Sequence, residues 1–246
     1  MKVSIITATY NSAATFADTL RSVESQTYKD IEHIIVDGQS NDATLEIVSE
    51  FPHVTKVISE KDNGIYDAMN KGIKLATGEI LGILNSDDFY IYSDVLQNIV
   101  EQFEDNHVDC VYADLDYVDP RNTNKVIRRW KSGPFNPTSF ELGWMPPHPT
   151  FFVRRYIYER YGAFNTSLGT AADYELMLRL LYVHKFACKY LPKTIVGMRV
   201  GGASNQNLLS RLKANKQDRL AWKMNNISPK FYTLIFKPLR KLIQYF

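Results

Sequence analysis

Short apolar runs alternate with amphipathic stretches along the first ninety residues of the chain. Four runs predict strands, and they cover residues 3–8, 32–36, 54–59 and 80–84; the last of these has the continuous hydrophobicity of a buried parallel strand. Apolar residues at helical spacing lie between them and predict a helix capped by Asn11 or Ser12, a short helix over 44–51 and a helix over 65–76. Because strands separated by helices favour parallel pairing with right-handed crossovers, we expect an α/β fold with a mostly parallel central sheet.

The pattern becomes less regular after residue 93. We expect a helix over 96–103, strands at 108–112, 115–118, 125–130 and 150–153, and a late helix over 173–183. The strands at 115–118 and 125–130 predict a small antiparallel hairpin. Residues 131–150 contain five of the ten prolines and predict an ordered loop or lid. We divide the chain into a domain of residues 1–205, with halves 1–90 and 91–205, and a C-terminal extension of residues 206–246.

The composition is that of an ordinary globular protein, with 45% hydrophobic and 23% charged residues. Cys110 and Cys188 lack the spacing of metal ligands and are expected to be thiols of a reducing compartment. The apolar run after Met1 is too short for a signal peptide or a membrane span, so we interpret the protein as cytoplasmic. Residues 206–246 carry nine Lys or Arg against the single Asp218, which predicts an anionic partner for this extension.

Polar clusters follow three of the predicted strands, at residues 7–11, 37–40 and 85–88, and a fourth cluster at 61–66 precedes a helix. The carboxyl ends of parallel strands share one edge of the sheet, and ligands of open α/β sheets bind outside that edge. Each cluster alone is ordinary turn chemistry. Four together predict a site for a base and ribose at Tyr10 and Asp37, a diphosphate at Lys71 and the helix start at Ile65, and a metal at Asp87.

Asp87 and Asp88 are neighbouring carboxylates directly after the fourth predicted strand. Two such anions repel each other unless a cation joins them, and Mg²⁺ or Mn²⁺ binds carboxylate oxygens together with substrate phosphates. The alternative for this tetrapeptide is a solvated turn or a helix cap. The chain contains neither the G-x-G-x-x-G nor the G-x-x-x-x-G-K-[ST] motif, so we expect the metal to neutralise most of a bound diphosphate. That arrangement suits a diphosphate that leaves during the reaction.

The chain resembles family 2 glycosyltransferases with the GT-A fold, in particular the branch that builds bacterial exopolysaccharides such as colanic acid. The resemblance rests on residues 9–11, 36–42, 62–72 and 84–88. It implies a nucleotide-diphospho-sugar transferase fold with a helical C-terminal tail. It also implies transfer of a sugar from a UDP-sugar, with inversion, to a hydroxyl of a saccharide or lipid-linked saccharide in surface polysaccharide biosynthesis.

The resemblance also assigns roles to individual residues. Asp37 contacts the uracil with Tyr10 stacked near it, and Asp87 is the metal ligand as the last acid of a D-x-D motif. Asn85 stands at the first position of that motif, and Asp88 supplies a further charge. The residues expected to contact the donor are Ala8, Thr9, Tyr10, Asn11, Asp37, Asp62, Gly64, Tyr66, Asn70, Lys71, Asn85, Ser86 and Asp87.

By the same resemblance, Asp173 at the start of the late helix is the catalytic base that takes the proton of the acceptor hydroxyl. The neighbouring acid that is usual in the family is Ala172 in this chain. A plain helix N-cap is the alternative for Asp173. Trp144 and His148 are expected near the acceptor, although a structural histidine is an equal alternative.

The extension carries an apolar stripe flanked by lysine and arginine, made of Phe231, Ile235, Leu239, Leu242 and Phe246. A basic amphipathic segment with aromatic residues is typical of proteins that lie on an anionic membrane surface, which predicts a peripheral location on the inner face of the plasma membrane. Docking against the protein's own core or within a homodimer is the alternative. No recognised nucleic-acid-binding motif supports a nucleic-acid partner.

Two other functions remain open from the residues alone. A sugar nucleotidyltransferase also combines a nucleotide-binding α/β sheet with a divalent metal, but it is expected to have a Gly-rich basic loop after the first strand. A non-catalytic subunit that binds a nucleotide-sugar is suggested by Asn85 and Ala172, which replace acids of the family pattern.

Overall fold

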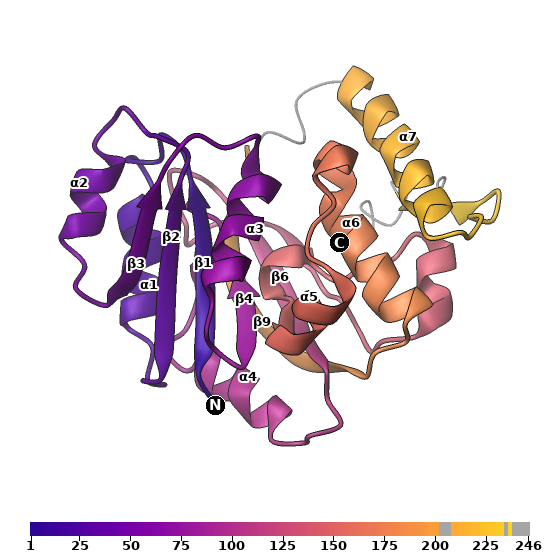
Figure 1. The fold of residues 1–246 in the computed structure, drawn as a ribbon, viewed down its shortest axis with the longest axis horizontal. Coiled ribbons are helices and arrows are strands. Elements are labelled where there is room, and N and C mark those ends of the chain that lie inside the picture. The colour runs from indigo at the N-terminus through magenta and orange to yellow at the C-terminus, as the bar shows by residue number, and fades with distance from the viewer. Residues whose placement is uncertain (202–207, 234–235, 238–246) are drawn as a thin grey trace.

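Nine strands of the described residues form one twisted sheet with helices on both faces (Figure 1). The structure is a computed structural model, and it describes residues 1–201, 208–233 and 236–237. The strand order is β3-β2-β1-β4-β8-β6-β9-β5, and β7 pairs with β6 outside this path. The expected α/β architecture with a mostly parallel sheet and one antiparallel hairpin is therefore confirmed.

The first half of the chain forms the parallel part of the sheet. Its strands are β1 (Val3–Thr9), β2 (Ile31–Asp37), β3 (Val54–Ser59) and β4 (Ile80–Ile83), and β1 lies between β2 and β4. The helices α1 (Phe16–Glu24) and α2 (Thr44–Ser49) pack on one face, and α3 (Ile65–Leu75) packs on the other (Figure 1). Each of these helices buries an apolar stripe against the continuous apolar strands, as the sequence pattern predicts.

The start of α1 differs from the prediction. This helix begins at Phe16, and neither Asn11 nor Ser12 caps it. Asn11 has a left-handed backbone, with φ of 49°, which is incompatible with the first turn of a helix. The Ser12 hydroxyl instead lies 2.8 Å from the hydroxyl of Ser86. Both residues therefore belong to the loop that leaves β1, and they shape that loop.

The second half adds strands of both directions. Its strands are β5 (Asp88–Tyr90), β6 (Cys110–Val118), β7 (Val126–Trp130), β8 (Phe152–Arg154) and β9 (Cys188–Arg199). The predicted strands at 108–112 and 115–118 are one continuous strand, β6, while β5 and β9 were not predicted. Because β8 is antiparallel to both β4 and β6, and β9 is parallel to β6, the carboxyl ends of β1, β2, β4, β6 and β9 lie at one edge.

The remaining helices surround this second half. They are α4 (Val95–Phe103), α5 (Arg155–Tyr161), α6 (Ala172–Met177) and α7 (Leu208–Met224), and a π-helical turn (Leu178–Val183) continues α6. Residues 131–150 form a loop with two 3₁₀ turns, Pro137–Leu142 and His148–Thr150. A further 3₁₀ segment, Thr166–Ala171, leads directly into α6.

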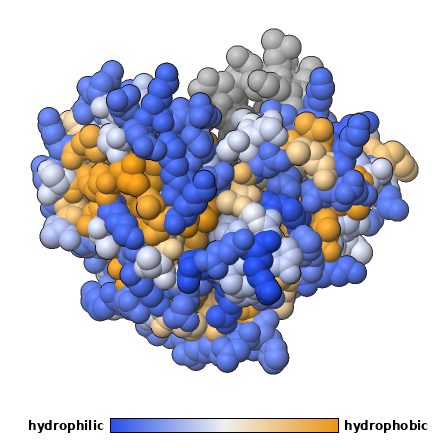
Figure 2. All heavy atoms as spheres, in the orientation of Figure 1, coloured by the Kyte–Doolittle hydropathy of each residue, from blue (hydrophilic) through white to orange (hydrophobic). Residues whose placement is uncertain are grey.

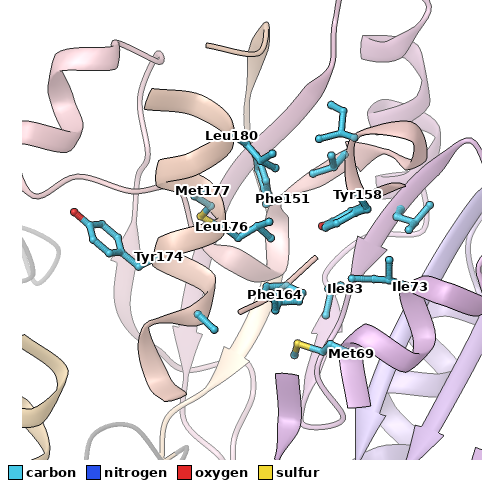
Figure 3. Packing of buried hydrophobic residues seen from close by; sticks show 14 of the residues in the cluster. Met69, Ile73, Ile83, Phe151, Tyr158, Phe164, Tyr174, Leu176, Met177 and Leu180 are labelled. Carbon is cyan, nitrogen blue, oxygen red and sulfur yellow. The ribbon is translucent and has the colours of Figure 1, made fainter. Parts of the chain in front are cut away.

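A continuous apolar core joins α3 to α6. Phe164 is buried between these helices, with Met69 of α3 on one side and Leu176 of α6 on the other (Figure 3). The Asn70 side chain donates to the Phe164 carbonyl and accepts from the Phe164 N–H, each at 2.9 Å. This pair of bonds fixes residue 164 to the helix that follows β3.

The C-terminal segment packs against α6. Trp222 of α7 is buried, and its indole N–H donates to the Tyr174 hydroxyl at 2.8 Å. Leu220 is 42% exposed, because Ala221 and Trp222 occupy the inner side of the helix. Phe231 is 89% exposed, while Ile235, Leu239, Leu242 and Phe246 of the predicted stripe lie outside the described residues. Within the described part of the chain, no helix has the length and hydrophobicity to span a bilayer.

A buried carboxylate lies at the amino ends of the central strands. Glu32 of β2 is almost fully buried and accepts hydrogen bonds from Ser4 Oγ at 2.6 Å, Thr77 N at 2.7 Å and Lys56 Nζ at 3.1 Å. Burial opposes the charge of Glu32, but these hydrogen bonds prevail and lower its pKa to about 2. This edge is therefore stabilised by satisfied buried charge.

Candidate functional site

The opposite edge of the sheet brings the predicted polar clusters together. The carboxyl ends of β1 to β3 and the first turn of α3 lie side by side at the upper edge in Figure 1. Thr9 at the end of β1 accepts a hydrogen bond from Gly38 N at 2.8 Å, which joins the first cluster to the second. The face seen in Figure 2 is mostly hydrophilic, with an apolar area over β2 and β3.

Asp37 ends β2 and is fully buried beneath a tight turn. Its carboxylate accepts hydrogen bonds from Ser40 N at 3.0 Å, from Ser59 Oγ at 2.6 Å and from the Ser40 hydroxyl. These bonds shape residues 38–40, where Gln39 has a left-handed backbone with φ of 68°. The carboxylate thus fixes the turn that follows β2.

Tyr10 and Asp62 flank this turn. The Tyr10 side chain is 62% exposed. A Cβ atom placed on Gly38 would lie 2.5 Å from Asp62 Oδ2 and 3.4 Å from Tyr10 Cδ2. A side chain at position 38 would therefore displace the Asp62 carboxylate, which together with Tyr10 forms a surface suited to an aromatic base and its ribose.

The start of α3 provides backbone donors at the same edge. Gly64 precedes the helix with φ of 108°, and its N–H donates to Asp62 Oδ1 at 2.8 Å. The first N–H groups of a helix lack intrahelical partners and carry the positive end of its dipole, which favours anions such as a diphosphate. Lys71 lies on α3, where its Nζ is 2.8 Å from Glu60 Oε1 and donates to the Lys61 carbonyl at 2.9 Å.

Side chains from distant segments hold the loop after β4. The Thr15 hydroxyl donates to the Ser86 carbonyl at 3.2 Å, and the Thr19 hydroxyl donates to the Asp88 carbonyl at 2.6 Å. Arg199, at the end of β9, donates to the Asp87 carbonyl at 2.6 Å. Sequence reasoning did not identify Arg199, because it lies 112 residues from Asp87 and belongs to a strand that the pattern did not predict.

The two carboxylates of this loop differ in environment. Asp88 is fully buried and accepts from Asn85 Nδ2 at 2.8 Å, while its Oδ1 has no hydrogen-bond partner in the described part of the chain. Burial and the charge of Asp87 raise the pKa of Asp88 well above its usual range. Asp87 is more exposed, and burial raises its pKa to a smaller extent, opposed by Arg199.

This donor set fits a hard divalent cation. An unpaired buried carboxylate oxygen beside a second carboxylate and an amide oxygen favours Mg²⁺ or Mn²⁺ over softer metals. Within the residues that the structure describes, no group of three or more His, Cys, Asp or Glu side chains converges. Asp87, Asp88 and Asn85 therefore suit a cation that receives its remaining ligands from water and substrate phosphates.

Asp173 approaches this edge from the other half of the sheet. It is half-buried at the start of α6, and its Oδ1 accepts from Tyr174 N at 2.7 Å. Burial and the charge of Asp173 raise the pKa of Tyr66, a residue of α3. Burial lowers the pKa of His148, and the charge of Asp173 opposes this shift.

Tyr117 connects the acid loop with Asp173. The strand registers place Tyr117 of β6 opposite Met198 of β9, and Met198 opposite Asp88 of β5. Burial raises the pKa of Tyr117, Arg128 lowers it, and the charges of Asp88 and Asp173 raise it further. The charges of Asp88 and Asp173 therefore both raise the pKa of Tyr117, although 85 residues separate the two acids in the chain.

Two of the predicted residues have other partners in the structure. Trp144 is buried, packs against Tyr112 and Phe140, and donates from its indole N–H to the Ser132 carbonyl at 2.9 Å. The side-chain amide of Asn70 hydrogen-bonds the backbone of Phe164. Both side chains support the walls of the site in this structure.

Comparisons with known proteins agree on the class of this fold and site. The model of the family described as glycosyl transferase family 2 matches residues 4–164. A PGL/p-HBAD biosynthesis glycosyltransferase of Mycobacterium bovis is 33% identical over 208 residues, which cover 82% of this chain and 78% of that protein.

Two solved structures share the fold. TarS 1–349 of S. aureus in complex with UDP-GlcNAc superposes with a TM-score of 0.69 at 18% identity, covering 100% of this chain and 78% of TarS 1–349. The mannosyltransferase PcManGT of Pyrobaculum calidifontis, in complex with GDP-Man and Mn²⁺, gives a TM-score of 0.67 at 20% identity and covers 96% of this chain and 68% of its own.

Proposed function

This chain belongs to glycosyl transferase family 2, and we propose that it transfers a sugar from a UDP-sugar to an acceptor hydroxyl with inversion at the anomeric carbon. Its glycosyltransferase class and GT-A fold follow from the family match and the structural neighbours. The observation that carries the proposed chemistry is that the polar clusters after β1 and β2 and before α3 meet at one edge of the sheet, while Asn70 of α3 hydrogen-bonds Phe164, on the segment that leads into α6 and Asp173. The elements that carry the donor clusters and the candidate base are therefore joined.

The donor lies along the edge formed by β1, β2, α3 and the loop after β4. Tyr10 and Asp37 hold the base and ribose, and the α3 start holds the diphosphate. The other donor contacts are Ala8, Thr9, Asn11, Asp62, Gly64, Asn85 and Ser86. The complex of TarS with UDP-GlcNAc supports a UDP-sugar as donor.

Asp87 and Asp88 hold a divalent cation, assisted by Asn85. When bound, this cation offsets the negative charge that develops on the leaving diphosphate. The Mn²⁺ in the complex of PcManGT with GDP-Man supports this assignment. Because Lys71 is already paired with Glu60, the α3 start supplies the positive potential that the protein itself directs at the diphosphate.

Asp173 accepts the proton of the acceptor hydroxyl as that oxygen attacks the anomeric carbon. The bond from the anomeric carbon to the diphosphate oxygen breaks on the opposite side, and UDP leaves with the electron pair. General base catalysis of this kind contributes about 10²–10⁴-fold to the rate. We assign His148 to the acceptor side of the site, because the charge of Asp173 acts on its pKa.

The acceptor is a saccharide or a lipid-linked saccharide of a surface polysaccharide. The exposed aromatic side chain of Phe231 and the nine basic residues of the extension support contact with an anionic membrane surface, on the cytoplasmic side. The relative named for PGL/p-HBAD biosynthesis supports an acceptor of the glycolipid class.

The test uses UDP release from a panel of UDP-sugars, with and without saccharide acceptors, and the variant Asp173→Asn. We expect the wild type to hydrolyse one donor slowly and the variant to bind UDP with unchanged affinity while it loses at least 100-fold in turnover. Wild-type turnover by Asp173→Asn would refute the assignment of the base. UDP binding without hydrolysis or transfer would favour a non-catalytic binding subunit, and pyrophosphate release from UTP and a sugar phosphate would favour a nucleotidyltransferase.

A further inference from the structure

Three successive carbonyl groups of the acid loop, residues 85–88, accept hydrogen bonds from side chains outside the loop. The middle one, Asp87 O, accepts from Arg199 Nη1 at 2.6 Å. The carbonyl groups before and after it accept from the hydroxyls of Thr15 and Thr19, at 3.2 Å and 2.6 Å. Arg199 is the only charged donor among these three. The backbone that carries the two acids is therefore held from outside, and its central contact is to a guanidinium.

The Arg199 side chain is itself fixed between two elements. It is buried at the end of β9, and its Nη2 lies 2.5 Å from Asp18 Oδ2 of α1. The ring of Phe89 lies 5.2 Å from the guanidinium and covers Gly197, where an added Cβ atom would lie 2.5 Å from Phe89 Cζ. Because a guanidinium presents its donors in a planar fork, the bonds to Asp18 and to Asp87 O together define its orientation.

The charge and the hydrogen bond of Arg199 have opposite effects on a cation. A positive charge beside Asp87 and Asp88 repels a divalent ion, so by its charge alone Arg199 weakens metal binding. The Asp18 carboxylate offsets much of this repulsion, because it lies 2.5 Å from Nη2. The hydrogen bond to Asp87 O instead restrains the backbone from which both carboxylates project. Removal of Arg199 therefore changes metal affinity in a direction that shows which effect is larger.

We propose that Arg199 is a positioning residue for the metal-binding acids: by fixing the Asp87 carbonyl it holds the carboxylates of Asp87 and Asp88 in the orientation that receives the cation. This inference rests on the proposed role of these acids as ligands. Asp88 Oδ1 has no hydrogen-bond partner in the described part of the chain, so its direction depends on the backbone that carries it. Ligands that are already oriented bind more tightly, because binding then orders fewer groups.

The variant Arg199→Met tests this inference because it keeps an apolar stem and removes the charge and the donors. Calorimetry measures UDP binding over a series of Mn²⁺ concentrations and in EDTA. We expect the apparent Kd for Mn²⁺ in the presence of UDP to rise about tenfold, the range for the loss of a hydrogen bond from a charged group. The affinity for UDP in EDTA should stay within twofold. Arg199→Lys should give an intermediate Kd for Mn²⁺, because an ammonium group lacks the planar fork that reaches both partners.

The control is Arg21→Met, which removes an exposed arginine whose Nη1 lies 3.3 Å from Oδ1 of the same Asp18 carboxylate. We expect this variant to keep the wild-type Kd for Mn²⁺. An unchanged or lower Kd for Mn²⁺ in Arg199→Met would overturn the inference and leave the proposed function intact. Thermal denaturation checks that Arg199→Met is folded; if it is not, a wild-type Kd in Arg199→Lys would overturn the inference. A wild type that binds UDP equally well in Mn²⁺ and in EDTA would instead refute the proposed metal site.

Discussion

The buried carboxylate of Glu32 gives the most quantitative prediction for the stability of this fold. Its pKa is lowered from an ordinary value of 4.5 to about 2, by hydrogen bonds that outweigh the cost of burial. A difference of about 2.5 pH units corresponds to about 3 kcal/mol of stabilisation at neutral pH. Because the pKa is lower in the folded state, this contribution is complete above pH 4.5 and disappears as the pH falls toward 2.

The variant Glu32→Gln removes this titration and keeps the volume of the side chain. We expect its free energy of unfolding to be about 3 kcal/mol lower than that of the wild type at pH 6, measured by urea denaturation. The difference between the two proteins should shrink by about 2 kcal/mol between pH 6 and pH 3. The exposed Glu46→Gln serves as the control and should match the wild type throughout. A difference that is constant over this pH range would refute the reasoning.

Two further predictions concern the donor side of the site. Gly38→Ala places a Cβ atom 2.5 Å from Asp62 Oδ2, so we expect Asp62 and Tyr10 to move and the affinity for UDP to fall about tenfold in calorimetry, with an unchanged melting temperature; an unchanged affinity would show that this close approach has no role in binding. Asp88→Asn is isosteric, and we expect it to remove most of the gain in UDP affinity that Mn²⁺ provides over EDTA, with little loss of stability. A full Mn²⁺ effect in this variant would exclude Asp88 as a ligand.

The sequence pattern predicted the helices and strands that are determined by residues close together in the chain. The helix over 65–76 and the strand over 54–59 have nearly the observed bounds, because continuous or periodic apolar residues determine which side is buried. The strands β5 and β9 were not predicted, since their pairing joins Asp88 to Met198 across more than a hundred residues. Pairing between residues so far apart in the sequence leaves no pattern within a short stretch of the chain.

The candidate site shows the same limit. The polar residues at the strand ends do meet at one edge of the sheet, because parallel strands bring their carboxyl ends to the same edge. The pattern did not distinguish side chains that face the crevice from those that support it. Lys71 pairs with Glu60, and Asn70 binds the backbone of Phe164, contacts that depend on the tertiary structure. Arg199 holds the acid loop from the end of an unpredicted strand.

The strand β8, which is antiparallel to both of its neighbours, separates the two halves of the sheet. It is three residues long and pairs with β4 at two positions and with β6 at two positions. The parallel ladder of β1 to β4 therefore shares few backbone contacts with the strands that follow. We therefore expect substitutions or insertions in residues 91–205 to leave the parallel ladder of β1 to β4 intact.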